Sequence, residues 1–170
     1  MTRLVGFFLL QLAAALYARE RISENLQKTD ALRDYCDMLE QFRGLLESDG
    51  APMPALFALL SERSSGEAGA FVMLLSHEMD KLGEHHFQNI WQRALTENAS
   101  CLDKETKREL EALGTVLGRY DHTTQLNAID TCREHLRRRL EDRQRTENQD
   151  KRVTLALSIS SSLLVGIILI

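Results

Sequence analysis

Two Leu-Gly pairs, Leu113-Gly114 and Leu117-Gly118, stand four residues apart at the end of an apolar helical pattern. A glycine inside a helix costs roughly 1 kcal/mol relative to alanine, so Gly114 indicates that a neighbouring helix backbone approaches closely there. Gly118 stands where the residue that follows a helix often takes a positive φ. Asp121 comes next, at a position from which its carboxylate can cap the following helix. The segment therefore predicts a tight corner between two helices, in which the glycines serve packing and not catalysis.

Elsewhere the apolar residues recur at the three- and four-residue spacing that is typical of amphipathic helices. The only two prolines, Pro52 and Pro54, share one turn, and no long segment alternates apolar and polar residues. Six helices are expected, over about 23–47, 54–63, 67–81, 84–98, a segment capped by Asp103 that ends at Gly118, and a segment from Asp121. Short connections between such helices predict an all-α fold, an antiparallel bundle of about six helices with a membrane helix at each end.

The core of this bundle is predicted from the same spacing. In the first helix the core stripe is expected to contain Leu26, Leu32, Tyr35 or Cys36, Leu39, Phe42 and Leu46. Trp91, the only tryptophan, most simply belongs to the core, although a tryptophan can also anchor a protein in a groove of its partner.

The N-terminal end carries an uncharged apolar run over residues 4–18. As a helix this run covers roughly 23 Å, which is short of a hydrocarbon core of about 30 Å. Arg3 and Arg19 flank it, and their long side chains can extend it by reaching outward to the headgroups. We interpret 1–19 as a membrane anchor. A cleaved signal peptide is the alternative, because Arg3, the apolar run and Ala13-Ala14-Ala15 supply its parts.

The C-terminal end, residues 153–170, also lacks charged side chains, and its last eight residues are all without polar side chains. It would span roughly 27 Å as a helix, which is nearly enough to cross a bilayer. A buried core helix is the alternative, but this run is apolar on every face. We therefore expect three parts: an N-terminal anchor or signal-like segment at 1–19, a helical bundle at 20–150, and a transmembrane helix at 151–170.

Charge predicts how these parts are oriented. Basic residues gather next to both apolar runs, after the first and before the last: Arg19, Arg21, Lys28, Arg33, Arg133, Arg137, Arg138, Arg139, Arg143, Arg145, Lys151 and Arg152. Since basic loops stay inside, the bundle is expected in the cytoplasm at the cell membrane, with both termini across it. The net charge of −4 argues against a general nucleic-acid binder.

No motif for catalysis or cofactor binding is present. There is no Gly-rich phosphate loop with Lys-Ser or Lys-Thr and no His-Glu-x-x-His. Cys36, Cys101 and Cys132 match neither a disulfide framework nor a zinc motif. A zinc site that uses His77, His85 and a nearby carboxylate is an alternative to ordinary surface histidines. The sequence thus predicts no enzyme, no cofactor and no small-molecule substrate.

The segment 133–145 is rich in arginine and includes Arg137, Arg138 and Arg139. It is either a solvated helix face or a surface that docks on a membrane or a partner, and its place beside the apolar C-terminal run strengthens the second interpretation.

These features, in their order along the chain, resemble the stage III sporulation protein AB family. The resemblance rests on Leu-Gly-x-x-Leu-Gly-x-x-Asp from Leu113 to Asp121, on Gln125 four residues later and on Trp91 before it. It also includes the N-terminal apolar run, the turn with two prolines before Ala55-Leu56-Phe57, and the apolar tail with Gly166.

The resemblance implies a cytoplasmic helical bundle like those of type II secretion inner-membrane platform proteins. It implies a non-enzymatic scaffold in the mother-cell membrane, part of the secretion-like channel between mother cell and forespore that endospore formation needs. The implied partners are other stage III sporulation proteins, including a cytoplasmic secretion-type ATPase. The alternative is a membrane-tethered helical signalling or sensor module unrelated to sporulation, with the histidines as a metal or pH site. The structural or interaction candidates are Trp91, Leu113, Gly114, Leu117, Gly118, Asp121, Gln125, Arg137, Arg138 and Arg139.

Overall fold

The computed structural model describes the backbone of residues 2–49, 52–79, 86–117 and 119–169, and the side chains of residues 20, 23–48, 52–79, 86–117 and 119–146. Within this part of the chain the fold is all-α, with six helices and no strand. The helices are α1 (Thr2–Asp49), α2 (Met53–Arg63), α3 (Gly66–Met79), α4 (Phe87–Asn98), α5 (Lys104–Val116) and α6 (His122–Leu169). The predicted all-α class is therefore confirmed.

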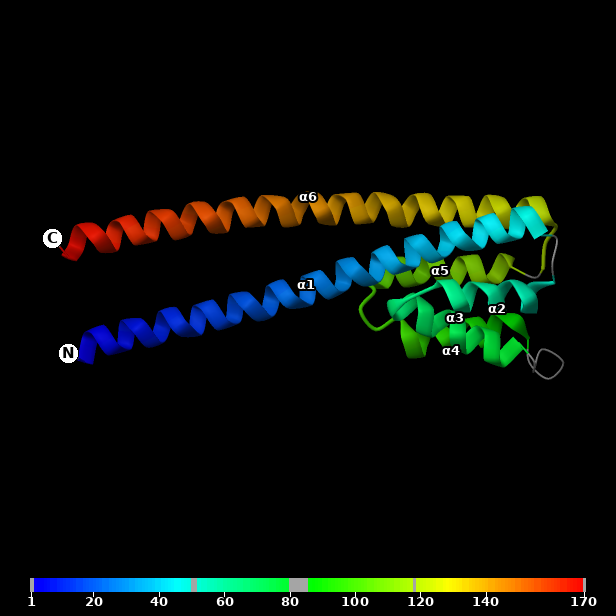
Figure 1. Cartoon of the computed structure of the whole chain (residues 1–170), viewed down its shortest axis with the longest axis horizontal. Helices are drawn as coiled ribbons and strands as arrows, with labels where there is room; N and C mark the ends of the chain where they lie inside the picture. Colours follow the sequence, from blue (N-terminus) through cyan, green and yellow to red (C-terminus); the bar gives the residue numbers. More distant parts are fainter. Residues whose placement is uncertain (1, 50–51, 80–85, 118, 170) are drawn as a thin grey trace.

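The two longest helices, α1 and α6, lie side by side and carry the short helices on one flank (Figure 1). Successive helices alternate in direction (Figure 1). α3 contacts α1, α2 and α4, and α5 contacts α4 and α6. Both ends of the chain lie on the same side of the bundle, because α1 enters it and α6 leaves it at that side (Figure 1).

Most helix boundaries fall within a few residues of their predicted positions, with one large difference. The helical anchor expected over 1–19 and the helix expected over 23–47 form one continuous helix, because the backbone of α1 is helical from Thr2 to Asp49 without interruption. α2 begins beside the proline turn because Pro52 has an extended backbone and the second proline, at the start of the helix, needs no amide hydrogen. α4 begins at Phe87, later than predicted, and residues 80–85 before it lie outside the described residues.

The core is formed between α1 and the inner faces of the other helices. Its largest fully buried side chains include Trp91, Tyr35, Phe42, Phe57 and Phe71. The predicted stripe of α1 is buried, with Tyr35 rather than Cys36 on the inside, as Tyr35 is 0% exposed.

Leu26 is the exception, since 42% of its surface is exposed. Its place along α1 explains this. A β-carbon on Gly66, the first residue of α3, would meet the carboxylate of Asp34, so α3 begins at the level of Asp34. Among the side chains that are described, the buried residues of α1 continue back only to Thr29, and Leu26 lies three residues earlier, among the exposed residues 23–28. The prediction that Leu26 belongs to the core is therefore wrong.

Among the side chains that the structure describes, no helical stretch is both long and apolar enough to cross a membrane. The two runs on which the sequence predicts membrane helices, 4–18 and 153–170, lie outside those side chains.

Candidate functional site

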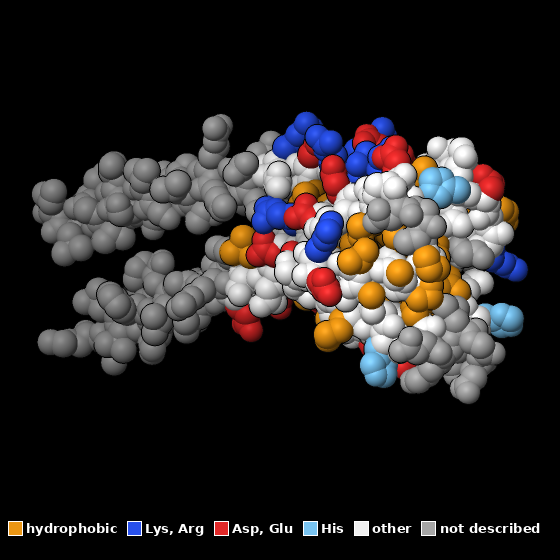
Figure 2. Space-filling view, turned by 45° about the vertical axis from the view of Figure 1, so that its right-hand side comes forward, with side chains coloured by type: hydrophobic (Ala, Val, Ile, Leu, Met, Phe, Trp, Pro, Cys, Tyr) orange, Lys and Arg blue, Asp and Glu red, His pale blue; other side chains and the backbone are white. Residues whose placement is uncertain are grey.

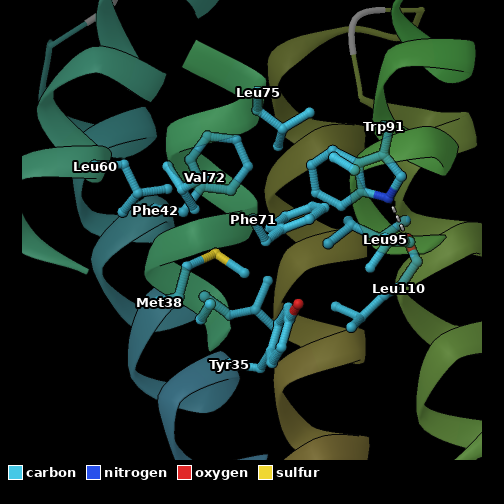
Figure 3. Packing of buried hydrophobic residues seen from close by; sticks show 14 of the residues in the cluster. Tyr35, Met38, Phe42, Leu60, Phe71, Val72, Leu75, Trp91, Leu95 and Leu110 are labelled. Carbon is cyan, nitrogen blue, oxygen red and sulfur yellow. Dashed lines mark hydrogen bonds between the residues drawn. The ribbon is translucent and has the colours of Figure 1, made fainter. Parts of the chain in front are cut away.

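The corner that the sequence singles out is built on one contact between α4 and α5. The indole of Trp91 on α4 is 1% exposed, and its Nε1–H donates a hydrogen bond of 2.8 Å to the carbonyl oxygen of Leu110 on α5 (Figure 3). One turn later, Gly114 presents no side chain to the ring. A β-carbon there would lie 2.6 Å from the Cγ and Nε1 atoms of Trp91. The close approach expected at Gly114 thus exists, but the neighbour is a side chain and not a helix backbone, because the indole fills the space.

Other aromatic rings hold the indole in place. Phe71 meets Trp91 edge to face, with ring centroids 4.9 Å apart and an angle of 89° between the planes (Figure 3). Phe87 and Phe57 lie further out, at centroid distances of 5.7 and 6.3 Å. Such pairs stabilise a core beyond the area that they bury. Trp91 is therefore a core residue that links α2, α3, α4 and α5.

The corner itself begins where α5 ends at Val116. Leu117 has an extended backbone, with φ −62° and ψ 132°, and its amide still donates to the carbonyl of Leu113. Leu113 is 2% exposed and Leu117 is 0% exposed, so both side chains anchor the turn in the core. Gly118, for which the sequence predicts a positive φ, lies outside the described residues.

Asp121 caps the start of α6, as predicted. Its carboxylate accepts hydrogen bonds from the amide of Thr124 at 3.1 Å and from the Thr124 hydroxyl at 2.6 Å. These bonds from Thr124 lower the pKa of the Asp121 carboxyl, because they stabilise its charged form. Gln125 closes the same turn from the other side, since its Nε2 donates to the carbonyl of Tyr120 at 2.7 Å.

The opposite end of α5 is fastened by Asp103. Its carboxylate accepts from the amide of Thr106 at 2.8 Å and from Arg143 Nη2 at 2.7 Å, and Arg139 Nη1 lies 3.6 Å away. Partial burial raises the pKa of Asp103, but hydrogen bonds from Thr106 and Arg143 outweigh it, so this pKa lies below its usual range. Arg139 therefore sits at the far end of α5 from the glycine corner, and contributes to fastening α5 to α6.

The other two arginine candidates are paired along their own helix. Arg137 Nε lies 3.3 Å from Glu141, and Arg138 Nε lies 2.9 Å from Glu134. Exposed pairs of this kind contribute less than about 1 kcal/mol. Blue and red side chains accordingly alternate along the upper edge of the bundle, where α6 lies (Figure 2). The segment is thus a mixed-charge surface and not a purely basic one.

Two grooves flank α5. The α4–α5 groove has a volume of about 270 Å³ and is lined by Gln88, Trp91, Gln92, Arg108, Glu111, Ala112 and Thr115. The α5–α6 groove has a volume of about 360 Å³ and is lined by Glu109, Ala112, Leu113, Val116, Thr124, Asn127, Ala128, Thr131 and Cys132. Both are open and shallow, and Ala112 borders both, so the outer face of α5 forms a ridge between them.

The candidate residues thus separate into groups. One group lies together in the core and consists of Trp91, Leu113, Gly114 and Leu117. A second group, Asp121 and Gln125, lies at the corner. The third group consists of the arginines along α6. The core group and the corner group thus hold α4, α5 and the start of α6 together, and leave the outer face of α5 exposed.

Two contacts were missed because their partners are distant in sequence. Glu67 at the start of α3 accepts from the Ser100 hydroxyl at 2.7 Å and from the Cys101 amide at 3.0 Å, and so holds the turn between α4 and α5. His122 Nε2 lies 2.7 Å from the carbonyl oxygen of Leu46, and so joins the start of α6 to the end of α1. Glu67 and His122 carry no sequence signal beyond their helix-terminal positions.

The histidines do not converge in the part of the chain that is described. That part holds no group of three or more His, Cys, Asp or Glu side chains able to bind a metal ion. His77 is exposed on α3, and His85 lies outside the described residues.

Comparison with known proteins gives one family. The sequence profile of the stage III sporulation protein AB family matches residues 3–170. A solved structure entitled "Stage III sporulation protein AB (SpoIIIAB)" is similar with a TM-score of 0.65 and 17% identity, over 72% of this chain and 98% of that chain. At this identity the structural likeness establishes a shared fold alone. None of the curated proteins matches the chain.

Proposed function

Because this chain belongs to the stage III sporulation protein AB family, we propose that it is a non-enzymatic platform component of the apparatus between mother cell and forespore. The match to the family over residues 3–170 is the observation that carries this proposal. In this role the bundle is a scaffold in the mother-cell membrane that offers its surfaces to other stage III sporulation proteins, among them a cytoplasmic secretion-type ATPase.

The arrangement of α1 and α6 supports a membrane anchor at both chain ends. These helices extend from the same side of the bundle, and their outer ends contain the apolar runs 4–18 and 153–170 (Figure 1). Two membrane helices that leave one side of a domain hold it against one membrane surface. The basic residues next to both runs favour the cytoplasmic surface for the bundle.

The interior of the bundle supports a structural role over an enzymatic one. Trp91 and Gly114 meet in a closed contact, and Asp121 and Asp103 use their carboxylates to cap helices. These groups are thereby committed to packing and to helix ends. The open grooves beside α5 suit contact with another protein better than enclosure of a small molecule.

The test is the number of heat-resistant spores formed by a strain that lacks this gene, combined with microscopy of engulfed forespores. We expect development to arrest after engulfment, and the full chain to restore it. A chain truncated after Arg152, which lacks the apolar tail, should not restore it. Normal spore numbers in the deletion strain would overturn the sporulation role. Full rescue by the truncated chain would overturn the need for the C-terminal anchor.

A further inference from the structure

The outer face of α5 carries several charged side chains without partners. Five charged side chains of α5 make no ion pair or side-chain hydrogen bond with any residue that the structure describes: Lys104, Glu105, Lys107, Arg108 and Glu111. Glu109 is the exception on this helix, because it lies 3.1 Å from His135. On α6, by contrast, the arginines from 133 to 145 each lie within 4.0 Å of a carboxylate. The charges of α5 are thus open to an external partner.

Two of these charges lie one turn apart at the α4–α5 groove. Arg108 and Glu111 are exposed and line the groove together, and Ala112 beside them is small and exposed. Residues three and four apart share one face of a helix, so these three residues and Thr115 form one continuous surface. The opposite wall carries Gln88 and Gln92, whose amides can accept or donate hydrogen bonds. Ala112 is a small residue beside these two opposite charges, so it leaves room for another helix to approach.

We propose that this face of α5 binds the same face of a second copy of this chain, in a two-fold symmetric and antiparallel contact. In an antiparallel pair of identical helices, the two-fold axis can pass at the midpoint between residues 108 and 111. Residue 108 of one copy then lies opposite residue 111 of the other. Arg108 then faces Glu111 of the partner subunit, and the symmetry makes the reciprocal pair. A two-fold interface must be complementary to itself, and one positive and one negative charge at this spacing meet that requirement.

The placement of Lys104 agrees with this orientation. It is the first residue of α5, where a positive charge is unfavourable beside the positive end of the helix dipole. In the antiparallel contact, Lys104 lies next to the C-terminal end of the partner's α5. The negative end of the helix dipole there attracts a cation. The same association therefore relieves an unfavourable position in each copy. It requires neither the membrane placement nor the sporulation role proposed above.

The test measures association between two differently tagged copies of the full chain in detergent, by co-purification and by energy transfer between labelled copies. Two single variants, Arg108→Glu and Glu111→Arg, are compared with a double variant that carries both substitutions in one chain. A fourth sample is a mixture of the two single variants. Matched controls are Arg63→Glu and Glu62→Arg, which make the same charge changes at exposed, unpaired positions of α2. Helix content and melting temperature of each variant show whether it is folded.

Each single variant should weaken self-association roughly tenfold or more, because like charges then oppose each other in both symmetric pairs. The double variant should associate like the original chain, because its charges are exchanged but still opposite. A mixture of the two single variants should form mixed pairs, since every contact between them joins opposite charges. The control variants should associate like the original chain.

Three results would overturn the proposal: an original chain that is monomeric at all concentrations, single variants that associate unchanged, or a mixture that does not associate more strongly than either single variant. The mixture also controls for a loss of stability in either variant. If the mixed single variants associate more strongly than each variant alone, both must present a folded α5 surface. If the single variants form fewer spores but still self-associate like the original chain, the face of α5 binds a different protein and the proposal is overturned.

Discussion

The indole of Trp91 occupies the space that a side chain at Gly114 would need, and its Nε1–H bonds to α5 one turn before that glycine. The glycine and the tryptophan are therefore one feature, although 23 residues separate them in the sequence. A close contact of this kind depends on both partners, and this gives the first two predictions.

Gly114→Ala should lower the free energy of unfolding by about 1–3 kcal/mol, as is typical when a methyl group is forced into a packed core. The gain in helix propensity, about 1 kcal/mol, offsets only part of the clash. Urea unfolding followed by circular dichroism measures the change. The control is Gly44→Ala on α1, where a β-carbon meets no atom within 4 Å, so that this substitution should stabilise the protein. Equal effects at both positions would contradict the steric explanation.

Trp91→Phe should lower the free energy of unfolding by about 2 kcal/mol, because a hydrogen bond is lost and a cavity is left. The smaller ring should also make room at position 114. The double variant with Gly114→Ala should then lose less stability than the sum of the two single variants, by about 0.5 kcal/mol or more. Strict additivity in this double-mutant cycle would show that the two residues do not share the space.

Asp103→Asn should make stability less sensitive to acid. The pKa of Asp103 is lower in the folded protein than its ordinary value of 3.8, so its stabilising effect is complete above that value and is lost as the pH falls through the folded pKa. At pH 6 the variant should be less stable by about 1 kcal/mol, since the ion pairs with Arg139 and Arg143 are partly exposed. Once the pH lies well below the folded pKa of Asp103, the two proteins should be equally stable. Asparagine can still cap the helix, so the difference reports the charge.

Cys132 should react much more slowly with a maleimide than Cys101 in the folded protein at pH 7. Cys132 is buried, and burial raises the pKa of its thiol to about 12, so almost no thiolate is present. Cys101 is half-buried and thus more accessible, although a hydrogen bond with Glu67 raises its pKa as well. Mass spectrometry of peptides after brief labelling measures both rates, and labelling in urea is the control. Rapid modification of Cys132 without urea would contradict its burial.

Much of the architecture followed from local pattern. Apolar spacing located the helices, the proline turn separated α1 from α2, and Asp103 and Asp121 were recognised as helix caps. These features are predictable because a helix and its caps depend on residues within a few positions of one another.

What could not be predicted depends on distant residues. The sequence indicated a neighbour for Gly114 but not that it is Trp91, and it gave no sign that Arg143 bonds to Asp103 across 40 residues. It also placed Leu26 in the core, because periodicity shows which face of a helix is apolar but not how far along the helix its neighbours extend.

The pairing of α1 with α6 has a consequence for how the protein is made. Arg43 on α1 bonds to Asp130 on α6, which is 87 residues later in the chain. During synthesis, α2 and α3 can cover part of α1 early, but the strip that faces α6 has no partner until α6 has left the ribosome. The bundle therefore cannot close before α6 is made, and a chain that stops before α6 is left with an unfinished interior.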